Sequence, residues 1–232
     1  MTTRQGGVSA APYDTMNPRP GIGDAPEAVA ENRARLQRAL GLRSVPLSQV
    51  HGTVVFEIDA ASAAAPMPEA DASVCVSPGF ACEVQAADCL PVLFADVQGR
   101  GVAAAHAGWR GLAGGVIEAA LAKLVERSGA RPEDIEAWLG PCIGPRSFEV
   151  GPDVLGAFGA ALDAPGDRFV AGAVSGKWFA DLPGLARDRL ERAGVRRIDG
   201  GRWCTFEDAS RFFSFRRDGR CGRLAACIGL AR

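Results

Sequence analysis

Four short apolar segments in the first half of the chain constrain its fold more than any other feature of the sequence. They occupy residues 72–76, 81–86, 90–95 and 102–105, and residues that favour turns separate them. Apolar segments this short with such boundaries are typical of buried β-strands, since helices need about ten residues or more. The sequence therefore predicts a sheet-forming region, which follows an Ala/Pro-rich surface loop over residues 60–68.

Amphipathic segments and further strands surround this region. The clearest helix begins after Asp24, which is expected to cap it, and ends at Gly41. Three more helices are expected over residues 113–127, 152–162 and 181–193, and five more strands over residues 45–50, 53–58, 135–139, 212–216 and 223–230, with a hairpin turn at Asp218-Gly219. This mixture predicts an α+β fold with one catalytic domain over residues 21–232, preceded by an extended or partly ordered N-terminal segment over residues 1–20.

Charge and cysteine content exclude several classes of protein. The 26 Lys and Arg residues nearly balance the 27 Asp and Glu residues, and the net charge of −1 argues against a nucleic-acid-binding protein. No apolar stretch is long enough for a transmembrane helix or a signal peptide, which predicts a cytoplasmic protein without membrane contact. The seven Cys residues are odd in number and form no CxxC motif, so reduced thiols are expected.

The only two histidines of the chain, His51 and His106, lie at the ends of predicted strands, and Cys89 lies at a strand edge between them. Two imidazoles and a thiolate suit Zn²⁺, which prefers tetrahedral nitrogen and sulfur ligands, and a fourth position stays open as in catalytic zinc sites. The spacing alone does not separate this hypothesis from two unrelated histidines and a buried structural cysteine. A third possibility is a Cys89 nucleophile with His106 as its base. Asp88 is a candidate acid/base, an orienting group, or a hydrogen-bond cap of a turn.

Arginine placement gives a second set of candidates. Arg33 lies on the apolar face of the first helix, Arg110 lies in a glycine-rich loop before a helix, and Arg146 follows Gly144-Pro145. Arginine beside a helix N-terminus suits phosphate or carboxylate, so these residues are candidate substrate ligands. The alternative is a solvated surface role, because the chain has twenty-four Arg and only two Lys.

Six ordered segments give the chain a resemblance to one protein family over nearly its whole length. The segments are residues 23–33, 49–52, 87–96, 106–111, 138–151 and 213–223. They resemble the laccase-domain or polyphenol oxidase family, whose members are also described as multi-activity purine nucleoside phosphorylases and as peptidoglycan editing factors. The resemblance implies a single-domain four-layer α/β/β/α sandwich with mixed sheets and a Zn²⁺ held by His51, Cys89 and His106.

The function implied by this resemblance is zinc-dependent phosphorolysis of adenosine, inosine and methylthioadenosine, with adenosine deaminase activity. The substrates are then purine nucleosides and phosphate, and we expect Arg33, Arg110 and Arg146 to contribute to substrate binding. One alternative is a Cys89–His106 hydrolase or amidase acting on cell-wall precursors. Another is a copper-binding phenol oxidase, but two histidines cannot supply both a blue-copper centre and the trinuclear cluster of a laccase. Copper is therefore expected only as an adventitious substitute for zinc.

Overall fold

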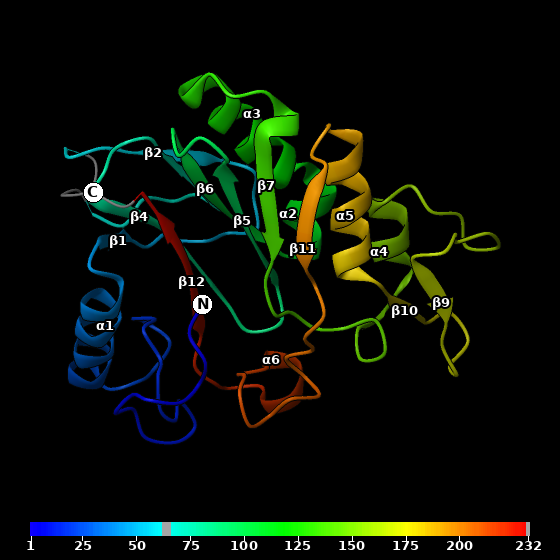
Figure 1. The fold of residues 1–232 in the computed structure, drawn as a ribbon. Coiled ribbons are helices and arrows are strands. Elements are labelled where there is room, and N and C mark those ends of the chain that lie inside the picture. Colours follow the sequence, from blue (N-terminus) through cyan, green and yellow to red (C-terminus); the bar gives the residue numbers. More distant parts are fainter. Residues whose placement is uncertain (62–65, 231–232) are drawn as a thin grey trace.

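The computed structural model describes residues 1–61 and 66–230, and within them it contains six α-helices and three β-sheets (Figure 1). The helices are α1 (Pro26–Leu40), α2 (Trp109–Gly114), α3 (Val116–Ser128), α4 (Pro152–Ala157), α5 (Leu182–Arg192) and α6 (Phe215–Asp218). The predicted mixture of helices and strands is confirmed. Residues 62–65 of the predicted surface loop lie outside the described residues. No helix of the described ranges has the length and apolar character needed to cross a membrane.

The largest sheet has six strands and contains three of the four apolar segments. Its strand order is β11 (Arg197–Gly200), β7 (Ile135–Leu139), β5 (Leu90–Asp96), β6 (Val102–Ala107), β3 (Ala72–Cys75) and β2 (Val55–Ile58). The outer pairs β11–β7 and β2–β3 are parallel and the inner pairs are antiparallel, so this sheet is mixed.

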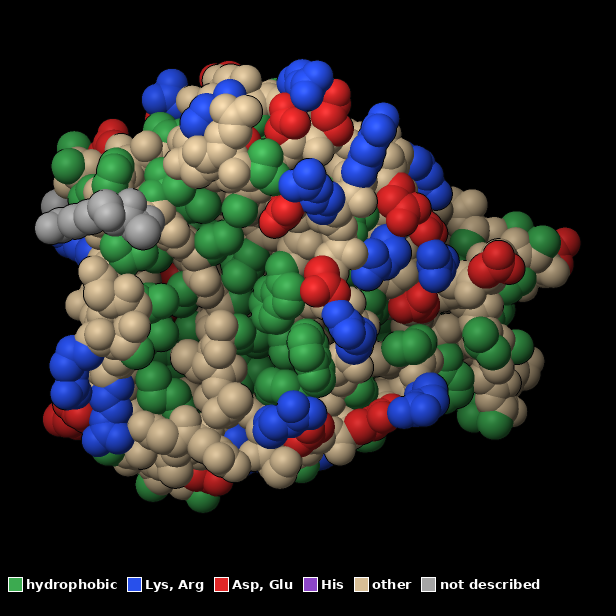
Figure 2. Space-filling view, in the orientation of Figure 1, with side chains coloured by type: hydrophobic (Ala, Val, Ile, Leu, Met, Phe, Trp, Pro, Cys, Tyr) green, Lys and Arg blue, Asp and Glu red, His purple; other side chains and the backbone are tan. Residues whose placement is uncertain are grey.

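Two three-stranded sheets complete the fold. One is ordered β1 (Arg43–Val45), β4 (Phe80–Ala86) and β12 (Leu224–Gly229), and β4 is the fourth apolar segment. The other is ordered β8 (Glu149–Val150), β10 (Trp178–Ala180) and β9 (Phe169–Ala171). The face drawn in Figure 2 intersperses basic and acidic side chains among the described residues, in keeping with the near-zero net charge.

Both faces of the large sheet are covered along β5, which explains why this strand is apolar from Leu90 to Ala95. Phe94 packs in one cluster with the buried side of α3, whereas Leu93 packs in another with Val84 of β4. Consecutive strand residues point to opposite faces, so one set is buried against the helix and the other against the second sheet. Helix α1 packs against that second sheet through Leu36, which contacts Ala225 of β12. The four-layer order implied by the resemblance stays a prediction.

The strand predicted over residues 212–216 is wrong, and so is the hairpin turn after it. Residues 215–218 form α6 instead, because the Ser214 side chain accepts a hydrogen bond from the Arg217 amide and caps the helix. Strand β12 pairs with β4, more than a hundred residues earlier in the chain, rather than with a neighbouring strand. Local alternation of apolar residues does not report such a distant partner.

Three other predicted elements differ in length. The helix predicted over residues 113–127 is divided into α2 and α3, since Gly115 between them adopts the left-handed conformation at a φ of 98°. The helix predicted over residues 152–162 ends at Ala157. The strand predicted over residues 45–50 is wrong beyond Val45, because β1 ends at that residue. Strands β8 to β11 were not predicted from the sequence, because each of them is only two to four residues long.

Residues 1–20 contain no helix or strand, but they pack against the rest of the chain. Asn17 is fully buried, and the Thr2 amide donates to the Ala225 carbonyl of β12 at 2.9 Å. Asp24, the predicted cap of α1, instead accepts hydrogen bonds from Ser9 (2.7 Å) and Asn17 (2.8 Å). The segment is thus anchored near both of its ends. The division of the chain at residue 20 stays a prediction.

Candidate metal centre

The structure brings His51, Cys89 and His106 together, although 38 and 17 residues separate them along the chain. One ligand atom from each lies within 4.8 Å of the other two, and His51 Nε2 is 3.7 Å from Cys89 Sγ. Zinc–ligand bonds of about 2.0–2.3 Å in tetrahedral geometry require ligand atoms roughly this far apart. The two imidazoles and the thiol therefore fit a metal ion of the zinc class.

Strand pairing explains how two of these ligands meet. In the antiparallel pair β5–β6, Pro91 is opposite His106, so Cys89, immediately before β5, lies beside the end of β6. Gly108 permits the close approach, because a Cβ atom there would lie 3.0 Å from Cys89 Sγ and 2.7 Å from a carbon of the His51 ring. A glycine at this position is thus required by the site rather than by a turn.

Asp71 organises both histidines, and the sequence analysis did not single it out. Its fully buried carboxylate accepts a hydrogen bond from His106 Nδ1 at 2.9 Å and others from the amides of Val50, His51 and Gly52 at 3.0, 2.9 and 2.7 Å. Burial alone raises the pKa of Asp71, but these hydrogen bonds outweigh it and lower the pKa below its usual value. This hydrogen bond keeps a proton on Nδ1 of His106, so Nε2 is the nitrogen through which the ring would bind a metal once it loses its own proton.

The electrostatics of the site favour a thiolate. Burial by itself raises the pKa of Cys89, but the imidazoles of His106 and His51 outweigh it and lower the pKa to about 6. Burial likewise lowers the pKa of His106, whereas the Cys89 sulfur and the Asp71 carboxylate raise it to about 9. The sulfur is therefore prepared in the form that binds Zn²⁺. The same pair also has the chemistry of a thiolate nucleophile beside an imidazolium.

Asp88 lies next to the candidate ligand Cys89, in the left-handed backbone conformation at a φ of 93°. Its Oδ1 accepts a hydrogen bond from the Thr205 hydroxyl at 2.6 Å, and its Oδ2 accepts one from the Arg216 amide at 2.7 Å. Both carboxylate oxygens are thus used to hold α6 and the loop before it. These contacts attach α6 to the residue before Cys89, and the acid/base and orienting roles of Asp88 both stay predictions.

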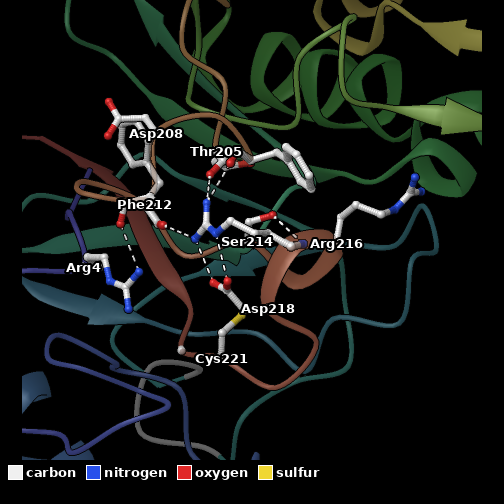
Figure 3. A network of polar contacts seen from close by, with 12 residues as sticks. Arg4, Thr205, Asp208, Phe212, Ser214, Arg216, Asp218 and Cys221 are labelled. Atoms are coloured by element: carbon white, nitrogen blue, oxygen red, sulfur yellow. Dashed lines mark hydrogen bonds and ion pairs between the residues drawn. The ribbon is translucent and has the colours of Figure 1, made fainter.

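The segment before α6 is stabilised by one arginine. The Arg217 guanidinium donates to the backbone carbonyls of Thr205, Phe206 and Phe212 at 2.7–3.0 Å and pairs with Asp218. Figure 3 shows Thr205, Phe212 and Asp218 among the residues of this polar network. A planar group with five donors suits several carbonyls at once. The contacts of Arg217 therefore stabilise the loop before α6, and with it the position of Phe215 at the start of that helix.

The three candidate ligands open into a cavity of about 360 Å³. Two arginines, Arg19 and Arg223, line it, and so does Phe215, whose side chain remains 58% exposed. Among the other lining residues are Ile22, Gln49, Gln85 and Ala87. Arg223 lies in one of the segments that carry the family resemblance, whereas no sequence pattern marks Arg19, which lies in the N-terminal segment.

The structure does not bring Arg33, Arg110 or Arg146 into the lining of this cavity. The Arg33 side chain does face inward, at 21% exposure, but its Nη1 pairs with Oε1 of the buried Glu83 at 3.1 Å. Arg110 is exposed and stacks on the adjacent indole ring, with its Cζ 4.2 Å from the ring centroid. Arg146 is 83% exposed and pairs with Glu207 at 2.7 Å.

Comparisons with known proteins place the chain in a family. A family model described as multi-copper polyphenol oxidoreductase laccase matches residues 1–231. The chain is 48% identical over 230 residues to a Pseudomonas aeruginosa protein named purine nucleoside phosphorylase PA4543, and 47% identical over 231 residues to an Escherichia coli protein named purine nucleoside phosphorylase YfiH. Each match covers 99% of this chain and 92% of the relative.

A solved structure gives the same result for the fold. The crystal structure of Neisseria meningitidis protein NMB0706 superposes with a TM-score of 0.92 at 47% sequence identity, covering 100% of this chain and 93% of that one. The crystal structure of the Bacillus licheniformis protein YfiH superposes with a TM-score of 0.91 at 28% identity. The resemblance inferred from the six sequence segments is confirmed, and the chain belongs to the multi-copper polyphenol oxidoreductase laccase family.

Proposed function

We propose that the protein is a zinc-dependent purine nucleoside phosphorylase. Such an enzyme breaks the bond between ribose C1′ and purine N9, joins C1′ to a phosphate oxygen, and lets the departing base take up a proton. The observation that carries the proposal is a single cavity in which the three candidate metal ligands lie with two arginines. The names of the relatives at 47% and 48% identity support the same reaction.

Arg19 and Arg223 are the proposed phosphate ligands. Arg19 uses Nη1 for the Leu47 carbonyl and for Gln85, and Arg223 uses Nη1 for nearby backbone carbonyls. Within residues 1–61 and 66–230, neither guanidinium has a protein acceptor for its Nε or Nη2. Burial and the charge of Arg223 together lower the pKa of Arg19, so the two like charges disfavour each other until an anion enters. A phosphate dianion supplies negative charge between the two arginines and accepts hydrogen bonds from several of their free N–H groups.

Phe215 is the proposed contact for the purine base. Its ring is largely exposed at the edge of the cavity and belongs to α6, which Asp88 holds in place. Stacking on an aromatic ring recognises a flat base without selecting among purines. Adenosine, inosine and methylthioadenosine are therefore all proposed substrates.

His51, Cys89 and His106 would hold the zinc ion, which would supply Lewis-acid polarisation when bound. Asp71 keeps the His106 proton on Nδ1, and the two imidazoles keep Cys89 as a thiolate. The two cavity arginines hold phosphate while its charge shifts toward C1′. The proposed adenosine deaminase activity adds water at C6 of adenine and releases ammonia, so it needs no phosphate and depends less on these arginines.

The main alternative is a hydrolase with Cys89 as nucleophile, which the lowered pKa of this thiol also supports. The two functions differ in what they need. A nucleophilic thiol forms a covalent adduct with substrate and works without metal, whereas a ligand thiol does neither.

The proposal is tested by incubating zinc-loaded protein with adenosine or inosine, with and without phosphate, and separating the products by chromatography. We expect free base and ribose 1-phosphate only when phosphate is present. Cys89→Ala should abolish this turnover, whereas Cys204→Ala, which changes a half-buried cysteine lining a separate cavity, is the matched control. Absence of turnover with every nucleoside, or a stable adduct on Cys89, contradicts the proposal and favours the hydrolase.

A further inference from the structure

A row of buried and half-buried polar side chains connects helix α1 to the cavity. Arg33 on α1 pairs with Glu83 of β4, with Nη1–Oε1 and Nη2–Oε2 distances of 3.1 and 3.3 Å. Gln85 Nε2 donates a hydrogen bond to Glu83 Oε1 at 2.6 Å, and Gln85 Oε1 accepts one from Arg19 Nη1 at 3.2 Å. Glu83 is fully buried and Gln85 nearly so. The row ends at Arg19, one of the two proposed phosphate ligands.

The chemistry of its neighbours fixes the orientation of the Gln85 amide. A carboxylate only accepts hydrogen bonds, so the amide nitrogen must face Glu83. A guanidinium only donates, so the amide oxygen must face Arg19. A glutamate at position 85 would place two carboxylates together, and a basic residue would repel Arg19. Among long side chains, glutamine is the one that joins an acceptor to a donor here without adding charge.

The backbone of Gln85 is held as firmly as its side chain. Strand β1 ends its pairing with β4 at Cys82, so the next residues of β4 lose their strand neighbour on that side. The Gln49 side chain takes its place, because its Oε1 accepts from the Gln85 amide at 2.8 Å and its Nε2 donates to the Gln85 carbonyl at 2.7 Å. On the other side, Gln85 is paired with Ala225 of β12. The amide therefore projects from a fixed point of the sheet.

Glu83 also balances the charge of the arginines around it. Burial and the charge of Arg223 lower the pKa of Arg19, and the charge of Glu83 acts in the opposite direction. A fully buried carboxylate with a guanidinium partner is weak evidence for stability, since apolar residues of similar size often serve a core as well. Because Glu83 contacts Gln85, which in turn contacts the proposed phosphate ligand Arg19, we infer that Glu83 contributes to phosphate binding rather than to stability alone.

We propose that Gln85 is a positioning residue that aims the Arg19 guanidinium at phosphate, and that Glu83 and Arg33 hold Gln85 for this purpose. The inference rests on the proposed phosphorylase function. Without the hydrogen bond to Gln85, the Arg19 side chain still donates to the Leu47 carbonyl but loses the second acceptor that defines the plane of its guanidinium. Phosphate binding then weakens, whereas the metal ligands stay in place because Asp71 and the β5–β6 pair hold them.

The experiment measures the KM for phosphate and the KM for inosine separately, together with zinc content and Tm. Arg19→Met tests the phosphate site itself and should raise the phosphate KM by roughly 100-fold. Gln85→Leu and Arg33→Met should each raise the phosphate KM by about 10-fold, with inosine KM and zinc content within about twofold of the parent protein. Arg38→Met, on an exposed position of the same helix, is the matched control and should change neither KM.

Two combined variants separate positioning from general stability. Gln85→Leu with Arg33→Met should raise the phosphate KM by about 10-fold and not 100-fold, because both residues act through one row. Glu83→Gln with Gln85→Glu reverses the polarity of the row, so that the new carboxylate meets Arg19 and the new amide meets Arg33. This pair should restore the phosphate KM to within about threefold of the parent value, although Glu83→Gln alone raises it about 10-fold.

The outcomes distinguish the inference from the proposed function. Normal phosphorolysis with a sensitive Arg19→Met variant, but an unchanged phosphate KM in folded Gln85→Leu and Arg33→Met, overturns the inference alone. An equal rise in both KM values with loss of zinc also overturns it, since that pattern indicates a structural role only. Absence of phosphorolysis in the parent protein overturns the proposed function and the inference together.

Discussion

The carboxylate of Asp71 and the imidazole of His106 are joined by a hydrogen bond of 2.9 Å between Oδ1 and Nδ1. The same carboxylate accepts hydrogen bonds from the three backbone amides of residues 50–52. One buried side chain therefore holds both the loop that contains His51 and the ring of His106. Asp71→Asn loses this arrangement, since an amide cannot accept from all these donors at once. We expect a 10- to 100-fold loss of zinc affinity, measured by competition with a chelator. Asp163→Asn, at an exposed position, should leave the affinity unchanged.

The thiol of Cys89 should be masked by metal. We expect about one Zn²⁺ per chain by elemental analysis, and slow alkylation of Cys89 by iodoacetamide until a chelator is added, because a ligand thiolate is not free to react. Mass spectrometry of the alkylated peptides measures this, with Cys204 as the internal control. Fast labelling of Cys89 in zinc-loaded protein contradicts the metal centre.

Asp88 offers a test between an orienting and an acid/base role. Both of its oxygens hold the segment that carries Phe215, so Asp88→Asn should raise the KM for nucleosides by roughly 10-fold and leave the turnover rate within about threefold of the parent value. Steady-state kinetics over a range of pH measures both. If turnover instead slows by roughly 100-fold or more and one limb of the pH profile disappears, Asp88 is an acid/base.

Phe215 should matter for the base and not for phosphate. Stacking is worth about 1–3 kcal/mol per base, so Phe215→Ala should raise the nucleoside KM by about 10-fold or more and leave the phosphate KM unchanged. Phe215→Tyr keeps the ring and should behave as the parent protein does. A normal nucleoside KM in Phe215→Ala removes this residue from the proposed base site.

Asp96 should contribute to stability in a pH-dependent way. Hydrogen bonds from the Arg100 side chain hold the pKa of its buried carboxylate at about 2, below the usual value near 4. A lowered pKa in the folded state stabilises the protein above about pH 4, and this contribution is lost as pH falls from about 4 toward 2.

Asp96→Asn should therefore cost about 1–2 kcal/mol in the free energy of unfolding at pH 7, the lower part of the range reflecting partial solvent screening of Arg100. Urea unfolding at pH 7, 4 and 3 should show the difference between the two proteins shrinking as the pH falls. A difference that stays constant with pH would show that the carboxylate charge is not its cause.

Local sequence pattern predicted the central strands of the large sheet and singled out the three candidate metal ligands, although spacing alone did not separate a metal site from a structural cysteine and two unrelated histidines. The segments at 90–95 and 102–105 are apolar because both faces of β5 and β6 are buried. Since successive strand residues point to opposite faces, burial of both faces requires an unbroken apolar run, which is visible in the sequence. His51, His106 and Cys89 were identifiable because the chain has only two histidines and both adjoin predicted strand ends. The inward position of Arg33 followed from helical periodicity alone.

Only the tertiary structure decided what these residues meet. Arg33 faces inward as expected, but its partner Glu83 is 50 residues away and lies on a strand whose pairing no local pattern reveals. Asp71, Arg19 and Phe215 reach the metal ligands or the cavity through contacts between distant segments, and a short polar or irregular stretch carries no periodicity that records them. Sequence determines which residues are buried through local alternation, whereas the choice of partner depends on how the strands pair and the sheets pack across the whole chain.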